Sequence, residues 1–202
     1  MTNRNIRRIK VLVWIAGLAP AVRLGFLALT GGLGANPIER ITLATGSTTL
    51  VLLLATLSIT PLRVVARQNW LARFRRLAGL FTFFYASLHF VTYVWLDQFF
   101  DVRAIIRDIG RRPFIAAGFT AFALMVPLAA TSTAGAIRRL GGRRWQLLHR
   151  LVYISGVAAV VHFWWKVKAD TREPAIYATV LALLLGFRLV WWVAHRRNSP
   201  RH

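Results

Sequence analysis

The sequence predicts an all-α integral membrane protein with six transmembrane helices. Of its 202 residues, 56% are hydrophobic, and the mean hydropathy is +0.51. This apolar content is above that of ordinary soluble domains. The apolar residues form six runs, each close to the length of about 20 residues that crosses a hydrocarbon core about 30 Å thick. Charged residues collect between the runs, in a pattern that also indicates orientation.

The predicted spans follow one another with short connections, at about residues 11–29, 41–59, 77–96, 113–130, 146–165 and 175–194. The first apolar run continues past the small residues near Pro20, so we expect a retained helix rather than a cleaved signal peptide. Residues 30–40 are rich in glycine and predict a turn-rich loop. Residues 97–112 are long enough for a short interfacial helix. Pro127 predicts a kink near the end of the fourth span.

The charge pattern predicts which side of the membrane each loop occupies. The head, the second-to-third loop, the fourth-to-fifth loop and the tail contain Lys and Arg without Asp or Glu, and all six acidic residues lie in the other three loops. By the positive-inside tendency, both termini are cytoplasmic. A net charge of +21 would suggest nucleic acid in a soluble protein. Here the basic loops are orientation signals and contacts to membrane lipid, so we expect no nucleic-acid partner.

Three histidines lie inside predicted spans, His89 in the third and both His149 and His162 in the fifth. Imidazole within a membrane is costly unless it has a partner, and such residues usually mark cofactors or proton paths. With a rise of about 1.5 Å per residue, His89 and His162 lie at similar depth toward the outer leaflet, while His149 is nearer the cytoplasm. Two histidines from two helices at one depth are what a bis-imidazole haem needs.

The chain contains no cysteine, which excludes disulfides, iron–sulfur clusters and thiolate ligation of haem. Without a Cys-x-x-Cys-His signal, any haem is non-covalent and therefore of the b type. Zinc and copper also bind imidazole, but they usually need a third or fourth protein ligand, and the spans contain no Cys, Asp or Glu. Room for a macrocycle is expected beside small residues, namely Ala86, Ser87, Ala158 and Ala159.

A packing role is the alternative reading of each histidine, and it is stronger for His149. This residue adjoins Arg150 close to a basic loop, where it can be interfacial or contact phosphate groups. On an ideal helix, thirteen residues place His149 and His162 about 140° apart. They therefore serve one stack of haems only if the span bends, and Gly156 is a candidate for that bend.

Several arginines are candidates for cofactor contacts. Arg76, Arg143, Arg144 and Arg150 can hold haem propionates or a flavin phosphate, or can be solvated loop charges. Arg23 either reaches toward the interface or pairs with a cofactor carboxylate. We expect His195 and His202 at the surface. Most of the eight tryptophans lie near span ends, which predicts an aromatic belt.

The residues resemble a known family. Six spans, a histidine in the third, a pair thirteen apart in the fifth and the string WQLLHRLVY at 145–153 are similar to the ferric-reductase-like transmembrane domain. Within it, the compact length, the string PLAATS at 127–132 and the missing nucleotide-binding domain resemble the MsrQ (YedZ) family. That family comprises haem-binding inner-membrane subunits of bacterial periplasmic methionine sulfoxide reductase systems. The resemblance covers the whole chain, and the WxxLHRLxY pattern is its most specific part.

The resemblance implies a function and a set of ligands. Such a subunit takes electrons from the quinone pool or a cytoplasmic flavin donor, such as a flavin reductase. It passes them to a periplasmic molybdopterin enzyme, MsrP, which reduces methionine sulfoxide in oxidised proteins. The implied cofactors are haem b and FMN, and the chain itself would be a non-catalytic subunit. By matching positions, His89 and His162 would be the axial ligands of an outer haem, and His149 the inner ligand.

One departure from the family pattern concerns the inner site. The fuller ferric-reductase pattern has a second histidine in the third span, about fourteen residues from the first. In this chain those positions hold Arg75 and Arg103. The inner haem therefore lacks an obvious second ligand, and a single haem with flavin at the inner site is the alternative.

Two other functions compete with electron transfer. A histidine-dependent proton-coupled transporter predicts pH-dependent flux without colour, and the absence of intramembrane carboxylates counts against it. A cofactor-free anchor for a soluble redox enzyme predicts that all three histidines can be replaced without loss of partner activity. No Ser/His/Asp constellation indicates catalysis, and Gly31–Gly34 is a turn rather than a phosphate-binding loop.

Overall fold

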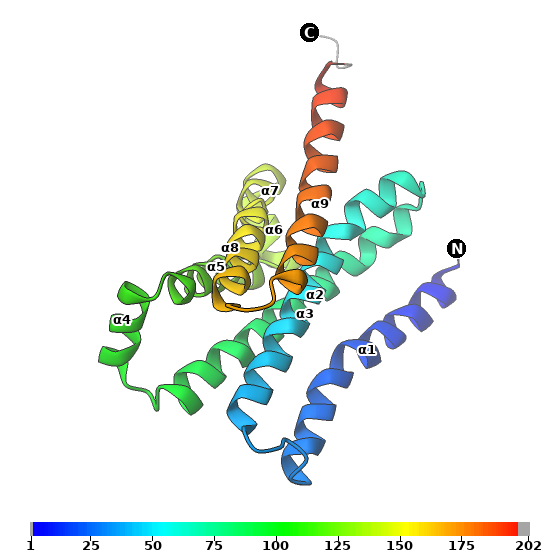
Figure 1. The fold of residues 1–202 in the computed structure, drawn as a ribbon. Helices are drawn as coiled ribbons and strands as arrows, with labels where there is room; N and C mark the ends of the chain where they lie inside the picture. The colour runs from blue at the N-terminus through cyan, green and yellow to red at the C-terminus, as the bar shows by residue number, and fades with distance from the viewer. Residues whose placement is uncertain (1, 198–202) are drawn as a thin grey trace.

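The computed structural model describes residues 2–197, and the side chains of residues 2–194. All regular elements in this part of the chain are helical (Figure 1). They are α1 (Asn3–Leu29), α2 (Pro37–Val65), η1 (Asn69–Leu71), α3 (Ala72–Val91), η2 (Thr92–Asp97), α4 (Val102–Arg111), α5 (Pro113–Ala130), α6 (Ala134–Leu140), α7 (Gly142–His149), α8 (Leu151–Lys166) and α9 (Arg172–Arg197).

Within the described residues, six helical segments are long and apolar enough to cross a membrane. They are Asn3–Leu29, Pro37–Val65, Asn69–Asp97, Pro113–Ala130, Gly142–Lys166 and Arg172–Ala194. Each predicted apolar run falls inside one of these segments, so the predicted fold class is confirmed. Most segments extend beyond the apolar run because a helix continues until its backbone groups meet a cap or a turn.

Local sequence signals explain where several helices begin. The Asn36 side chain accepts the Glu39 amide at 3.2 Å, and Pro37 occupies the first turn of α2, where its missing N–H costs nothing. The Asp101 carboxylate accepts the amides of Arg103 and Ala104 at 2.9 and 3.0 Å, which starts α4. A short helix is thus present in the 97–112 connection, as expected.

The fifth span is interrupted between α7 and α8. The Arg150 amide donates to the Leu147 carbonyl and the Tyr153 amide to the Arg150 carbonyl, so the helix tightens locally at Arg150. Gly156, where we expected a bend, lies inside α8 against Leu181 and Leu57. The interruption therefore separates the segment that carries His149 from the one that carries His162. In α5 the helix runs on through Pro127, and the kink there stays a prediction.

Two antiparallel helix pairs form the centre of the bundle. α2 packs along α3, α5 packs along α8, and α3 contacts α5 to join the pairs. α9 packs on α8 and α2, whereas α1 lies at the periphery (Figure 1). The shared core contains Leu50, Leu53, Leu54, Leu57, Ala86, Ala121, Met125, Ala159, Val160 and Leu181.

A buried tyrosine fastens α1 to this centre. The Tyr85 hydroxyl donates to the Gly17 carbonyl at 2.7 Å and accepts the Ala21 amide at 3.0 Å. These two backbone groups are four residues apart and would otherwise bond each other, so the hydroxyl is inserted into the helical ladder. A Cβ at Gly17 would lie 2.6 Å from the Phe81 ring, so only glycine permits this close approach. Trp14 adds an edge-on contact with Phe81 at a ring-centroid distance of 5.0 Å.

A half-buried arginine compensates for a proline in α2. Pro61 lies inside that helix and has no N–H to donate to the Leu57 carbonyl four residues earlier. The Arg188 guanidinium of α9 donates to this same carbonyl and also to the Leu184 carbonyl at 3.1 Å. The central carbon of the guanidinium group, Cζ, lies 5.4 Å from the centroid of the Tyr153 ring. Arg188 thus connects α9 to both α2 and α8.

Candidate functional site

The structure brings His89 and His162 together although 73 positions separate them in the sequence. His89 comes from α3 and His162 from α8, the helices that belong to different central pairs. Their ring centroids are 6.1 Å apart, and the ring planes are inclined by 78°. The similar depth expected from the sequence is therefore realised as direct proximity.

Each of the two imidazoles is held by a main-chain carbonyl of the neighbouring helix. The Nδ1 atom of His89 lies 3.0 Å from the Thr42 carbonyl, and the Thr45 hydroxyl is 3.4 Å away. The Nδ1 atom of His162 lies 2.6 Å from the Phe114 carbonyl. A carbonyl only accepts, so both Nδ1 atoms carry the proton and both Nε2 atoms present a lone pair. Metal-ligating histidines are commonly oriented in this way.

A glycine faces each ring. A Cβ at Gly46 of α2 would lie 3.1 Å from Cε1 of His89, and a Cβ at Gly118 of α5 would lie 2.7 Å from Nδ1 of His162. Any larger residue would displace the ring. Neither glycine was predicted to adjoin a histidine, although a glycine inside an apolar helical run is a recognised sign of close packing.

The pair fits a metal with two axial imidazoles. A metal bonded to an imidazole nitrogen lies about 2 Å from it, so two rings that share one metal have centroids about 6 Å apart. The observed 6.1 Å agrees with that value. No group of three or more His, Cys, Asp or Glu that could hold a metal occurs among the described residues. The donor set therefore suits haem better than zinc or copper, which need further protein ligands.

The four small residues that were expected to leave room for a macrocycle do not gather at one place. Ala86 and Ala159 are buried in the core beside the histidine helices. The Ser87 hydroxyl is occupied by a hydrogen bond to the Phe83 carbonyl at 2.8 Å. Ala158 lines an open apolar groove between α5 and α8 instead.

His149 forms a separate site at the end of α7. Its ring stacks on Trp145 with centroids 3.9 Å apart, and its Nδ1 lies 3.1 Å from the Trp145 carbonyl. The Trp145 indole is itself fixed by donating to the Thr131 carbonyl at 2.9 Å. The Nε2 atom of His149 is buried and makes no hydrogen bond of ordinary geometry, although the Leu128 carbonyl is close by. Such an unsatisfied nitrogen is available to a ligand.

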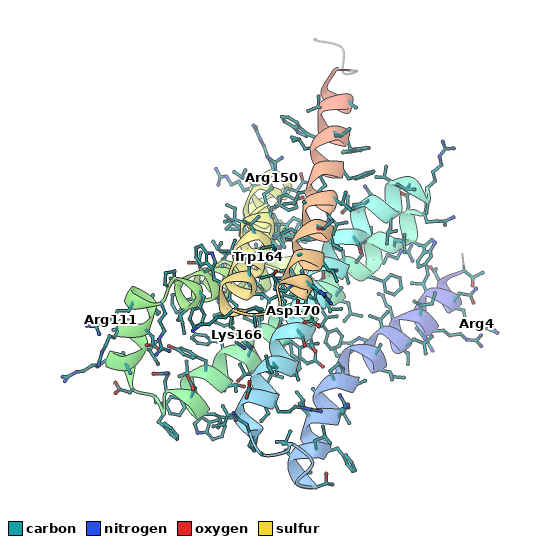
Figure 2. All side chains as sticks on the ribbon, viewed as in Figure 1. Arg4, Arg111, Arg150, Trp164, Lys166 and Asp170 are labelled. Atoms are coloured by element: carbon teal, nitrogen blue, oxygen red, sulfur yellow. The ribbon has the colours of Figure 1, made fainter. Side chains whose placement is uncertain are left out.

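The arginines predicted to hold a cofactor are exposed. Arg76, Arg143, Arg144 and Arg150 all lie at the surface of the described part of the chain. Figure 2 shows Arg150 and Lys166 at opposite ends of α8. Arg75, one of the two positions fourteen residues from His89, lies close enough to His149 and Arg188 to interact with both electrostatically.

Predictions were also made for Arg23, His195 and His202. Arg23 is exposed on α1. The His195 side chain and all of His202 lie outside the described residues. The main-chain carbonyls of Thr42 and Phe114 had no sequence signal, because every residue carries such a group.

Comparisons with known proteins agree with this architecture. The family model "Ferric reductase like transmembrane component" matches residues 41–160, which include His89 and His149 and end two residues before His162. A relative from Ralstonia nicotianae, named protein-methionine-sulfoxide reductase heme-binding subunit MsrQ, is 52% identical over 94% of this chain and 88% of its own length. A relative of the same name from Bordetella parapertussis is 52% identical over all of this chain and 98% of its own length. Another from Xanthomonas campestris is 50% identical over 96% of this chain and 91% of its own length.

No solved structure matches the chain. The match to the family model covers more than half of the sequence, and the named relatives align over nearly all of it. The chain therefore belongs to the ferric reductase like transmembrane component family and, within it, to the MsrQ family.

Proposed function

We propose that the chain is a haem b-binding electron-transfer subunit of a methionine sulfoxide reductase system. It passes electrons from the quinone pool or a cytoplasmic flavin donor to a periplasmic molybdopterin-dependent reductase of the MsrP type. Repair of oxidised periplasmic proteins would be the result. The observation that carries the proposal is the pair of His89 and His162, whose rings lie 6.1 Å apart. The names of its relatives, which are heme-binding subunits, support the same conclusion.

The protein's contribution at the outer site is to position two ligands. The Thr42 and Phe114 carbonyls hold the two Nδ1–H groups, which fixes each tautomer and increases the basicity of Nε2. Gly46 and Gly118 allow each ring to lie against the neighbouring helix. His89 and His162 would hold the haem, which would supply reversible one-electron chemistry when bound.

The inner site is proposed to hold FMN. His149 contributes an unsatisfied Nε2 and Trp145 an aromatic face, in the segment that adjoins the basic loops. Arg76 and Arg150 are proposed to contact the flavin phosphate, because both are exposed cations on the segments that flank this site. Arg75 adds positive charge beside His149.

The proposed location is the bacterial inner membrane, with both termini in the cytoplasm. Support comes from the loops that contain only basic charge, which lie on the same side of the six spans as the two chain ends. The outer histidine pair is then near the periplasmic face, where the acceptor would be. The His149 site is near the cytoplasmic face, where the donor would be.

A reduced-minus-oxidised visible spectrum of the purified protein tests the proposal, with pyridine haemochrome quantitation and release of flavin from the same sample. We expect a b-type α band, one haem per chain and FMN. His89→Ala and His162→Ala should each abolish the band. His149→Ala is the matched control, since it removes an intramembrane histidine but should retain the outer haem and lose FMN.

A spectrum that differs from this expectation would favour one of the alternative cofactors or functions. Two haems per chain would assign the inner site to haem instead of FMN. A colourless wild-type protein that was produced with haem available would refute electron transfer and favour the anchor. A colourless protein that conducts protons with a histidine-dependent pH profile would favour the transporter.

A further inference from the structure

Helix α4 presents three distinct faces. Ala104, Ile105, Asp108 and Ile109 are half-buried, so this face packs on the protein. Val102 and Ile106 are each 64% exposed and form an apolar outer face. The third face is a stripe of exposed arginines at intervals of four residues, Arg103, Arg107 and Arg111, which we call the arginine stripe. At about 100° per residue, the stripe is centred about 120° from the apolar face.

The arginine stripe has no ion-pair partner among the described residues. The two carboxylates nearest in sequence are occupied elsewhere. The Asp101 carboxylate accepts the Arg103 amide and so caps the helix. The Asp108 carboxylate accepts a hydrogen bond from the Tyr93 hydroxyl at 3.4 Å and forms an ion pair with Arg112 at 3.4 Å. Figure 2 shows Arg111 at the edge of the molecule, far from Arg150. The stripe is therefore a set of three free cations turned away from the bundle.

Helix α4 is also connected to both histidines of the outer site. Tyr93, which bonds Asp108, lies four residues after His89 along the same helical segment. On the other side, Arg112 pairs with Asp108 and lies two residues before Phe114, whose carbonyl holds His162. Asp108 thus contacts the segment that carries His89 and pairs with the residue just before α5, the helix whose Phe114 carbonyl holds His162. A molecule bound on α4 would be next to the end of the bundle that holds the histidine pair.

From this geometry we propose that the arginine stripe is the docking surface for the soluble electron acceptor, and that it binds an acidic patch on that protein. The inference rests on the function proposed above and adds the surface at which the acceptor binds. Exposed charges of one sign steer an oppositely charged partner and increase its association rate. Steering to this helix would bring the acceptor close to the outer redox site.

Anionic lipid is the other occupant that three arginines could attract. The apolar face of α4, with Val102 and Ile106, is the one suited to hydrocarbon. The stripe is turned about 120° from it, which directs the guanidinium groups toward water. This orientation favours a soluble protein over a lipid headgroup.

The experiment measures association of the MsrP-type reductase with the full-length, haem-loaded chain in nanodiscs of neutral lipid. Surface plasmon resonance gives the association rate constant at several salt concentrations. Stopped-flow absorbance follows reoxidation of the pre-reduced chain by the acceptor. The test variant is R103Q/R107Q/R111Q, and R103K/R107K/R111K keeps the charge. The matched control is R4Q/R7Q/R8Q, which removes three exposed arginines at the opposite end of the bundle.

We expect the glutamine variant at the stripe to associate at least about tenfold more slowly at low salt and to lose most of the salt dependence. The lysine variant and the control at residues 4–8 should behave like the wild type, and the α band should be unchanged in all of them. An association rate that is equal in the wild type and the stripe variant would overturn the docking surface. If, in addition, the stripe variant purified from the membrane carries less phosphatidylglycerol than the wild type purified in the same way, the stripe is a lipid site.

Failure of the proposed function gives a different pattern. If the wild type has no α band, the haem assignment is wrong, whatever the stripe does. If the wild type has the band but neither binds nor reduces the reductase, the acceptor is wrong and the docking surface falls with it. If the wild type binds and reduces the acceptor and the stripe variant does so equally, only the docking surface is wrong.

Discussion

Replacement of Gly118 by alanine should remove haem from the outer site while the helices remain folded. The new methyl carbon would lie 2.7 Å from Nδ1 and 2.9 Å from Cε1 of His162. Ordinary van der Waals contact begins at 3.4 Å, so the ring must move by about 0.7 Å relative to the helix that carries the methyl. Metal–ligand distances tolerate changes of only about 0.2 Å. The imidazole would no longer reach the metal.

The folded state should withstand the same change. Overpacking costs about 1–3 kcal/mol. Alanine in place of glycine inside a helix stabilises the folded state by about 1 kcal/mol. The net loss of stability is then no more than about 2 kcal/mol in the haem-free protein, because the Phe114 carbonyl and the ring can shift together. The variant should therefore separate haem binding from folding.

A series of glycine substitutions gives the assay its controls. At Gly46 the nearest atom of His89 is 3.1 Å away, so Gly46→Ala needs a shift of about 0.3 Å and should lower haem occupancy partly. At Gly186 in α9 nothing lies within 4 Å, so Gly186→Ala should leave occupancy unchanged. Haem per chain is measured by pyridine haemochrome, and folding by thermal unfolding of the haem-free forms. Full occupancy in Gly118→Ala would refute the proposed ligation by His162.

Two further predictions concern the contacts that hold the outer helices. Because Arg188 donates to the Leu57 carbonyl that Pro61 leaves without a partner, Arg188→Met should cost about 1–3 kcal/mol more in the wild type than in a Pro61→Ala background. A double-mutant cycle of unfolding measures this coupling, and additive effects would contradict the interpretation. Tyr85→Phe removes the hydroxyl that holds Gly17 and should lower stability by about 1 kcal/mol. Limited proteolysis should then cut α1 sooner than α9; unchanged cleavage of α1 would show that Tyr85 does not fasten it.

The fold class and the ends of the spans were largely readable from the sequence. Length and apolarity of a run are local properties, and caps such as Asn36 and Asp101 act within one turn of the helix they start. The similar depth of His89 and His162 followed from a fixed rise per residue. Their proximity in the structure, with centroids 6.1 Å apart, agrees with that reasoning. The interruption at Arg150 was not predicted, since no proline or glycine marks it.

The tertiary structure alone decided which groups support the histidines. The Thr42 and Phe114 carbonyls hold the rings, and Gly46 and Gly118 make room for them. A main-chain carbonyl has no sequence signature. In a soluble helix the apolar stripe would at least have indicated the inward face. Lipid tails are as apolar as the core, so the hydrophobic pattern of a span does not tell which face meets another helix. The rotation of each helix about its axis, and with it the site, therefore depends on the packing of the whole bundle.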